Sequence, residues 1–223
     1  EFGRDLAVDP KLLEAARERI SAAEARATRN VARADSLLLV VGRGTSDPDA
    51  NANVAKVARL LWEGMGFGWA ALGYSGVASP RTDEALTRAV RLGFPRIVVF
   101  PYFLFTGILV KRVYEAADDA ARRHPEIEFL KADYLGDHAL VLDALAERVD
   151  EIITGDNRMN CRLCKYRERI IGYEGDLGRP QAGHHLHVRG IGTDGDHQHS
   201  HEHDHPHEHG HAHTHPPKRG DRD

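Results

Sequence analysis

Two groups of residues in the last third of the sequence have the chemistry of metal ligands, and the first is a pair of cysteines. Cys161 and Cys164 are the only cysteines, and their CxxC spacing is one that proteins use to bind zinc or an iron–sulfur cluster. Two thiolates make half of such a site, so the other ligands would come from histidines, a second lobe or a second subunit. A redox dithiol and two incidental free cysteines are the alternatives, although a redox CxxC is expected to open a helix after a core strand.

The second group is a histidine-rich tail. The chain has 15 histidines, and from residue 197 onward almost every second residue is one, interleaved with Asp, Glu, Gly and Pro. Neutral imidazole binds borderline divalent ions such as cobalt, nickel, copper and zinc, and a tethered tail holds a bound ion at high effective concentration. We expect the tail to deliver or store metal ions, and a purification tag is the alternative. We also expect the tail to be disordered without metal, because its composition cannot bury a core. The candidate ligands of the tail are His197, His199, His201, His203, His205, His207, His209, His211, His213 and His215.

A glycine-rich turn is the first candidate binding site. The apolar run from Leu37 to Val41 breaks into GRGTS, which is typical of a buried parallel strand that feeds a tight turn at the carboxyl edge of a sheet. The turn offers backbone N–H groups near a helix N-terminus, and an arginine fork can bind a carboxylate or a phosphate. The turn matches neither GxGxxG nor a P-loop with its lysine, and a plain strand-to-helix turn is the alternative. The candidate substrate-binding residues here are Gly42, Arg43, Gly44, Thr45 and Ser46.

A second turn, rich in aromatic residues, is predicted at the same edge of the sheet. It spans residues 101–107, with the sequence PYFLFTG, and follows another apolar strand. An apolar wall beside an anion-binding turn suits a large flat ligand with carboxylates on its rim. The alternative is that the aromatic side chains only seal the top of the core. The candidate substrate-binding residues here are Tyr102, Leu104, Thr106 and Gly107.

Four strand–helix units must position these turns. Continuous apolar runs predict strands that are covered on both faces, and strands that alternate with helices predict right-handed crossovers and a parallel sheet. The fold class is therefore α/β, a flavodoxin-like lobe with a four-stranded parallel sheet. Strands are predicted over 37–41, 69–74, 96–100 and 127–132. The first of the four helices is predicted to end at residues 64–66, and the second to begin at Ser79-Pro80. The third is predicted to span 109–124. The fourth should run from a cap at Asp137 to Ile153, with Val141, Leu145, Val149 and Ile152 facing inward.

The chain begins with a further helix and is predicted to have four parts. Asp9-Pro10 should open a helix that runs to about Ala34 and carries an alanine-rich apolar stripe. We interpret this helix as a linker between two lobes, and an ordinary core helix is the alternative. The parts are a linker helix (1–35), the α/β lobe (36–153), a CxxC segment (154–180) and the tail (181–223). The sequence starts at Glu1 without a methionine, and we interpret it as a fragment of a longer protein.

Composition excludes several classes of protein. With 30 Lys and Arg against 34 Asp and Glu there is no basic surplus for nucleic acid. The longest apolar run, 97–110, is interrupted by Pro101 and Gly107 and is too short for a bilayer. No secretory signal is visible, so a cytoplasmic location is expected. His124 and His138, the only histidines of the lobe, are interpreted as structural or surface residues.

Several motifs together give this chain a family resemblance. They are GRGTSDPDAN after the first strand, PYFLFTGILVKRV at the third, YLGDH, the cysteine motif MNCRLCKYR and the terminal histidines. The chain resembles the long form of sirohydrochlorin cobaltochelatase, a class II tetrapyrrole chelatase of cobalamin biosynthesis, over about residues 35–215. The resemblance implies two α/β lobes that face each other across a tetrapyrrole cleft, insertion of cobalt(II) into sirohydrochlorin, and an iron–sulfur centre at Cys161 and Cys164.

The sequence departs from this family at two positions. The resemblance leads us to expect a histidine in the turn after the first strand and another after the third, but Arg43 and Leu109 stand there. An arginine is always charged and cannot serve as a base or a metal ligand. No catalytic residue is therefore assigned, and the chain resembles the C-terminal half, with Arg43 available for substrate carboxylates and the catalytic histidines on another lobe.

Two other functions compete with the chelatase interpretation. A non-catalytic cobalt or nickel storage or chaperone module on a degenerate chelatase scaffold would need the tail but no tetrapyrrole cleft. A flavodoxin-like domain that binds a phosphate or a nucleotide would need the backbone N–H groups of the glycine-rich turn.

Overall fold

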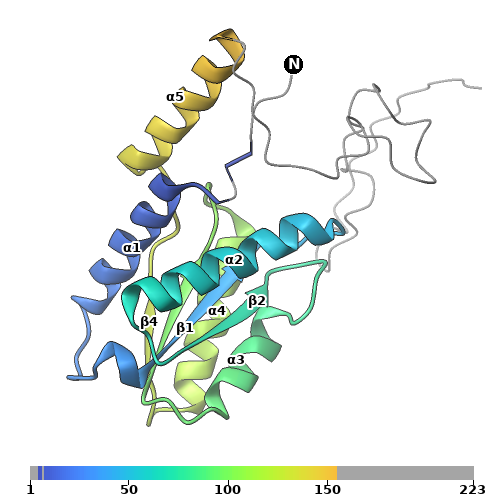
Figure 1. The fold of residues 1–223 in the computed structure, drawn as a ribbon. Coiled ribbons are helices and arrows are strands. Elements are labelled where there is room, and N and C mark those ends of the chain that lie inside the picture. Colours follow the sequence, from blue (N-terminus) through green and yellow to red (C-terminus); the bar gives the residue numbers. More distant parts are fainter. Residues whose placement is uncertain (1–4, 7, 155–223) are drawn as a thin grey trace, which may run out of the picture. The chain divides into compact units, whose positions relative to one another are not determined.

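The computed structural model describes residues 5, 6 and 8–154, and it confirms the α/β fold with a four-stranded parallel sheet (Figure 1). These residues belong to the first of two units into which the chain divides, Glu1–Gly190 and Ile191–Asp223. The strands are β1 (Ser36–Gly42), β2 (Trp69–Tyr74), β3 (Arg96–Pro101) and β4 (Glu128–Lys131), in the order β2-β1-β3-β4. Each predicted strand agrees with the observed one to within one residue at either end.

Helices cover both faces of the sheet (Figure 1). They are α1 (Pro10–Glu24), α2 (Pro48–Met65), α3 (Thr82–Val90), α4 (Ile108–Arg123) and α5 (Ala139–Thr154), with a short 3-10 helix η1 (Arg33–Asp35) before β1. Because side chains alternate along a strand, β1 sends Leu38 and Val40 into the core under α1, α2 and α5. Its residues Leu37 and Leu39 point into the core under α3 and α4. The continuous apolar character of the strands follows from this double burial.

Helix α1 packs as a core helix, and its interpretation as a linker between two lobes stays a prediction. Its buried residues, all at most 1% exposed, pack against the sheet in the core that also contains β1 and β3, as a core helix does. They are Leu12, Ala15, Ala16, Ile20 and Ala23. Pro10 opens the helix as predicted, with the side chain of Asp9 accepting from the N–H of Lys11 at 2.8 Å. The helix nevertheless ends at Glu24, well before Ala34.

A buried carboxylate accounts for the early end of α1. The backbone N–H groups of Thr28 and Arg29 donate to Oε1 of Glu128 at 2.7 and 3.1 Å, so they do not continue the helical ladder. The other oxygen of Glu128 accepts from Nε of Arg96 at 2.8 Å, and both side chains are less than 10% exposed. Arg96 also donates to the carbonyls of Arg29 and Val31. The segment between α1 and β1 is thus fastened to β3 and β4 by one ion pair.

The predicted starts of two helices are also wrong. Helix α3 begins at Thr82 and not at Ser79-Pro80, because the carbonyl of Pro80 accepts from the N–H of Tyr74 at 2.9 Å and keeps that residue with β2. Helix α5 is capped by His138 and not by Asp137, because Nδ1 of His138 accepts from the N–H of Leu140 at 3.3 Å. The side chain of Asp137 is 98% exposed.

The inward face of α5 also differs from the prediction. Val141 is buried as expected, but Leu145 is 37% exposed and Val149 is 55% exposed. Ala144 and Arg148 take the inward positions instead, because Arg148 forms a buried ion pair with Asp9 at 2.5 Å that orients the helix. An apolar stripe therefore remains at the surface. It consists of Leu142, Leu145, Val149 and Ile153.

Replacement of Glu128 by Gln should destabilise the protein by about 3–5 kcal/mol, because it leaves the guanidinium of Arg96 buried without its counter-charge. Burial opposes ionisation of Glu128, but the hydrogen bonds from Thr28, Arg96 and Arg29 outweigh it and hold the pKa of Glu128 below its ordinary value of 4.5. A lowered pKa in the folded state means that this stabilisation is present above the unfolded pKa and is lost as the pH falls through the folded one.

Urea unfolding followed by circular dichroism between pH 7 and pH 3 measures both effects. Glu126→Gln, two residues away and 66% exposed, is the matched control and should change the free energy of unfolding by no more than about 0.5 kcal/mol. An E128Q protein as stable as the wild type at pH 7 would contradict this account.

Candidate functional site

The two turns predicted from the sequence lie side by side at the carboxyl edge of the sheet. β1 and β3 are neighbours, and the N–H of Tyr102 donates to the carbonyl of Val41 at 2.8 Å beyond the end of β3. From β1 the chain continues to β2 on one side of β1, and it then returns to β3 on the other side of β1. The strand order therefore reverses between β1 and β3. Open α/β sheets bind their ligands at such points.

A cavity of about 510 Å³ opens between these turns. Arg43 lines it from the first turn, and residues 102–110 line it from the second turn and the start of α4. The predicted residues Tyr102, Leu104, Thr106 and Gly107 are therefore brought together with Arg43. Leu109 lines the same cavity, so the two positions at which the sequence departs from the family pattern meet in one site. The wall is strongly apolar, with Phe105 76% and Ile108 59% exposed.

The glycine at position 44 is required by the turn. Gly44 has φ +82°, and a Cβ atom there would lie 1.9 Å from the carbonyl oxygen of Gly76 in the loop after β2. The N–H of Gly76 in turn donates to the carbonyl of Arg43 at 3.0 Å. The turn after β1 is therefore packed against the loop after β2, and this contact holds the backbone of Arg43 in place.

The backbone of the first turn is a poor cradle for a phosphate. The N–H of Thr45 donates to Oδ1 of Asn51 at 3.2 Å, and the N–H of Asp47 donates to Oγ1 of Thr45 at 3.1 Å. The N–H of Asp49 at the start of α2 donates to the Asp47 carboxylate at 2.9 Å. Side chains thus already occupy donors that an anion would need, and a negative charge already sits at the helix N-terminus.

The guanidinium of Arg43 is the available anion contact. Arg43 is exposed, and among the described residues no side chain forms an ion pair or hydrogen bond with its guanidinium. A fork of charged N–H donors beside an apolar cavity can bind a carboxylate of a ligand whose body packs on the aromatic turn.

Tyr102 is the one phenol among the described residues that line this 510 Å³ cavity, and it stays protonated. Its burial, together with the nearby carboxylates of Asp9 and Asp5, raises its pKa far above the ordinary value of 10. Tyr102 also packs against Phe100 with 6.2 Å between the ring centres. The phenol can therefore donate a hydrogen bond, but it does not accept a proton at neutral pH.

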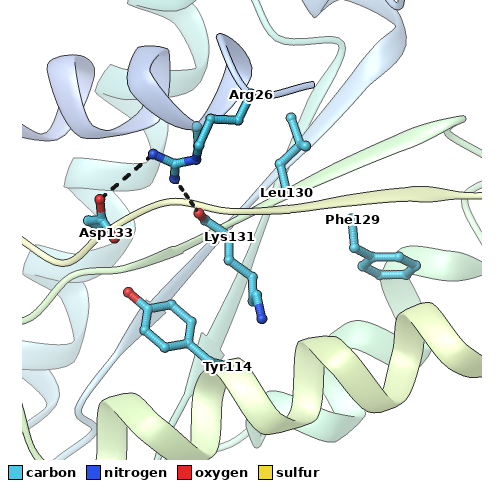
Figure 2. Close-up of a pocket in the computed structure, with 7 residues that line it drawn as sticks. Arg26, Tyr114, Phe129, Leu130, Lys131 and Asp133 are labelled. Atoms are coloured by element: carbon cyan, nitrogen blue, oxygen red, sulfur yellow. Dashed lines mark hydrogen bonds and ion pairs between the residues drawn. The ribbon is translucent and has the colours of Figure 1, made fainter. Parts of the chain in front are cut away.

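A second cavity, of about 330 Å³, lies beside the edge strand β4 (Figure 2). Its polar groups already pair with one another: Arg26 donates to the carbonyl of Lys131 at 3.1 Å and lies 4.0 Å from Asp133 (Figure 2). The hydroxyl of Tyr114 donates to the carbonyl of Ala132 at 3.0 Å, and burial with the nearby Asp133 raises its pKa to about 12. These contacts cap the carbonyls of Lys131 and Ala132 at the edge strand, so the polar groups of this cavity serve the edge of the sheet.

The structure does not describe the predicted metal ligands. Cys161, Cys164 and the ten tail histidines fall outside the described residues, and within the described ones no three His, Cys, Asp or Glu side chains gather to hold a metal ion. His138 caps α5 and contacts Glu18 at 3.0 Å, and His124 ends α4 beside Glu126 at 3.3 Å, so both have structural roles. No helix of the described part has the length and apolarity for a bilayer crossing.

Sequence reasoning missed one part of the site, the loop after β2. The hydroxyl of Ser75 donates to the carbonyl of Leu109 at 3.5 Å, and Gly76 contacts Arg43 as described above. The loop thus connects the two turns that line the cavity. Its position after a parallel strand next to β1 was the signal that could have identified it.

These features define an open α/β domain with a candidate ligand site at the carboxyl edge of its sheet, between an arginine and an apolar wall. Residues 37–152 match the family model CbiX, and the chain belongs to that family. It is 38% identical to the sirohydrochlorin cobaltochelatase of Priestia megaterium over 76% of this chain and 55% of that protein. It is 31% identical to the sirohydrochlorin ferrochelatase of the same organism over 69% of this chain and 55% of that protein.

A solved structure supports the fold. SirB from Bacillus subtilis with Fe³⁺ has a TM-score of 0.56 at 24% identity, over 67% of this chain and 56% of that one. The chain spans about half the length of the curated relatives it matches.

Replacement of Gly44 by Ala should destabilise the protein by about 1–3 kcal/mol, because the position has a positive φ and no room for a Cβ. Gly64→Ala is the matched control: it lies within α2 with no atom near the new Cβ and should stabilise by about 0.5–1 kcal/mol. Thermal unfolding of both variants tests this, and a G44A protein that gains stability would show that the turn has another conformation.

Proposed function

We propose that this chain is the substrate-facing lobe of a sirohydrochlorin cobaltochelatase, which inserts cobalt(II) into sirohydrochlorin in cobalamin biosynthesis. The observation that carries the proposal is the guanidinium of Arg43, which has no partner among the described residues and stands beside a 510 Å³ apolar cavity at the reversal of the strand order. A macrocycle with eight carboxylates has the matching chemistry: its flat body suits the aromatic turn, and a carboxylate suits the arginine.

Metal insertion requires a group that accepts the two pyrrole protons, and this cavity does not supply one. Its described lining residues are an arginine, a phenol of raised pKa, a threonine and apolar side chains. None of them is a base at neutral pH. We therefore assign the proton acceptor to a second chelatase lobe or subunit that faces this one across the substrate.

Two observations support a second lobe. The curated relatives are about twice as long as the part that matches this chain. The apolar stripe of α5, with Val149 55% and Ile153 75% exposed, is a face that a further domain could cover.

Cobalt is the proposed substrate ion, since the cobaltochelatase relative is more similar to this chain than the ferrochelatase from the same organism. The histidine tail would collect that ion and deliver it to the lobe. Cys161 and Cys164 would hold an iron–sulfur cluster together with ligands from a second lobe or subunit.

A storage or chaperone module for cobalt or nickel is the second candidate function. The histidine tail favours it, and so does the lack of a base among the described residues that line the cavity. Such a module has no need of a tetrapyrrole site, so sirohydrochlorin binding separates the two candidates. A nucleotide-binding domain is disfavoured, because Thr45, Asp47 and Asp49 already use their N–H groups within the protein.

Arg43→Ala should weaken sirohydrochlorin binding about fivefold, since an exposed charged contact contributes about 1 kcal/mol. Absorbance titration of the metal-free macrocycle measures the affinity, and Arg91→Ala, which removes an exposed arginine at the end of α3, is the matched control.

Cobalt insertion by the chain alone should be far slower than by the chain with a second lobe that carries histidines. Rapid insertion by the chain alone would contradict the assignment of the base to another lobe, and no binding at all would favour the storage module.

Deletion of residues 197–223 should lower the number of cobalt ions bound at equilibrium dialysis several-fold and leave sirohydrochlorin affinity unchanged. Unchanged cobalt binding after the deletion would contradict the delivery role of the tail.

The double substitution Cys161→Ser and Cys164→Ser should abolish iron and acid-labile sulfide in protein purified without oxygen. Unchanged sulfide content would contradict the proposed cluster.

A further inference from the structure

The loop after β2 contains a residue in an unfavourable backbone conformation. Val77 has φ +60°, and it is the only residue other than glycine with a positive φ in the described part of the chain. It is the central residue of a tight turn in which the N–H of Ala78 donates to the carbonyl of Gly76 at 2.6 Å. A positive φ at the centre of such a three-residue turn defines the rare and strained form of the γ-turn. A β-branched side chain is among the least suited to a positive φ. Val77 is therefore held in a strained conformation.

The fold gains little from the side chain of Val77. It is 56% exposed, so burial of its methyl groups offsets only a small part of the strain. A loop that only connects β2 to α3 would be more stable with Gly or Asn at this position. A strained residue whose exposed apolar side chain contributes little to the fold is a candidate for a contact outside the protein.

The neighbours of Val77 place it at the rim of the candidate site. Ser75 binds the carbonyls of Gly42 and Leu109 through its N–H and its hydroxyl, and Gly76 donates to the carbonyl of Arg43. A Cβ on Gly44 would lie 3.2 Å from the N atom of Ala78, on the other side of Val77. The strand order β2-β1-β3 sets the loop with Val77 on one side of the Arg43 turn and the aromatic turn on the other.

We propose that Val77 is a substrate-binding residue, which packs its methyl groups against the macrocycle while Arg43 binds a carboxylate on its rim. This inference rests on the proposed function. The apolar surface for the ligand then extends over both sides of Arg43, with Val77 on one side and Phe105 and Ile108 on the other. All three are more than half exposed in the chain without ligand. The tight turn restricts the backbone of Val77, so the residue is held next to the Arg43 turn before a ligand binds.

The proposal predicts opposite effects of one substitution on stability and on affinity. Val77→Asn should raise Tm by roughly 2–4 °C, because Asn occurs at positive φ more readily than a β-branched residue does. The same change should weaken binding of metal-free sirohydrochlorin roughly fivefold, because it replaces the methyl groups by an amide. Leu92→Asn is the matched control: Leu92 is 52% exposed but lies in the turn before β3, at the opposite edge of the sheet, and its replacement should leave the affinity unchanged.

The full chain is titrated as the wild type, V77N, V77G, L92N and R43A, with Tm measured on the same samples. A higher Tm with weaker binding for both Val77 variants supports the proposal. Unchanged affinity of V77N and V77G, while R43A binds more weakly, would overturn the role of Val77 and leave the proposed function intact. A lower Tm of V77N would also overturn it, because the strain would then be absent. A wild-type chain that does not bind sirohydrochlorin would overturn both.

Discussion

Burial of the sheet on both faces is the constraint on which the rest of this structure depends. Leu38 and Val40 of β1 need cover on one face, and Leu37 and Leu39 need it on the other. The crossovers of the chain therefore pass over opposite faces: α2 covers one, and α3 and α4 cover the other (Figure 1). The connections after β1 and β3 then diverge at the carboxyl edge, which leaves a crevice between neighbouring strands. The candidate site occupies this crevice.

Three loops form the candidate site in that crevice. The turn after β1 presents Arg43, the turn after β3 forms the apolar wall, and the loop after β2 joins the two through Ser75 and Gly76. The backbone of the first turn is satisfied by its own side chains, so recognition of an anion falls to the guanidinium of Arg43. Under the proposed function, this division lets a lobe without a base bind the substrate, because binding and proton transfer need different groups.

Two buried ion pairs fix the helices that flank the sheet. Arg96 and Glu128 attach the segment after α1 to β3 and β4, and Asp9 and Arg148 join the start of α1 to α5. Each pair is buried and carries additional hydrogen bonds, as a desolvated charge requires. Their positions determine where α1 ends and which side of α5 faces inward, and so they leave the apolar stripe of α5 at the surface.

Local patterns in the sequence determined the strands, the order of the elements and the two turns, because continuous apolar runs and glycine-rich strand ends are short-range signals. They also placed Arg43 and the aromatic turn at one edge, since the carboxyl ends of parallel strands meet there. Only the tertiary structure decided the rest. The end of α1 depends on Glu128, about 100 residues away, and the inward face of α5 depends on Asp9, at the far end of the chain. The loop that contains Val77 lies beside the Arg43 turn only through the close contact of Gly44 with Gly76. No short stretch of sequence contains both partners of these contacts, because the packing of other elements brings the partners together.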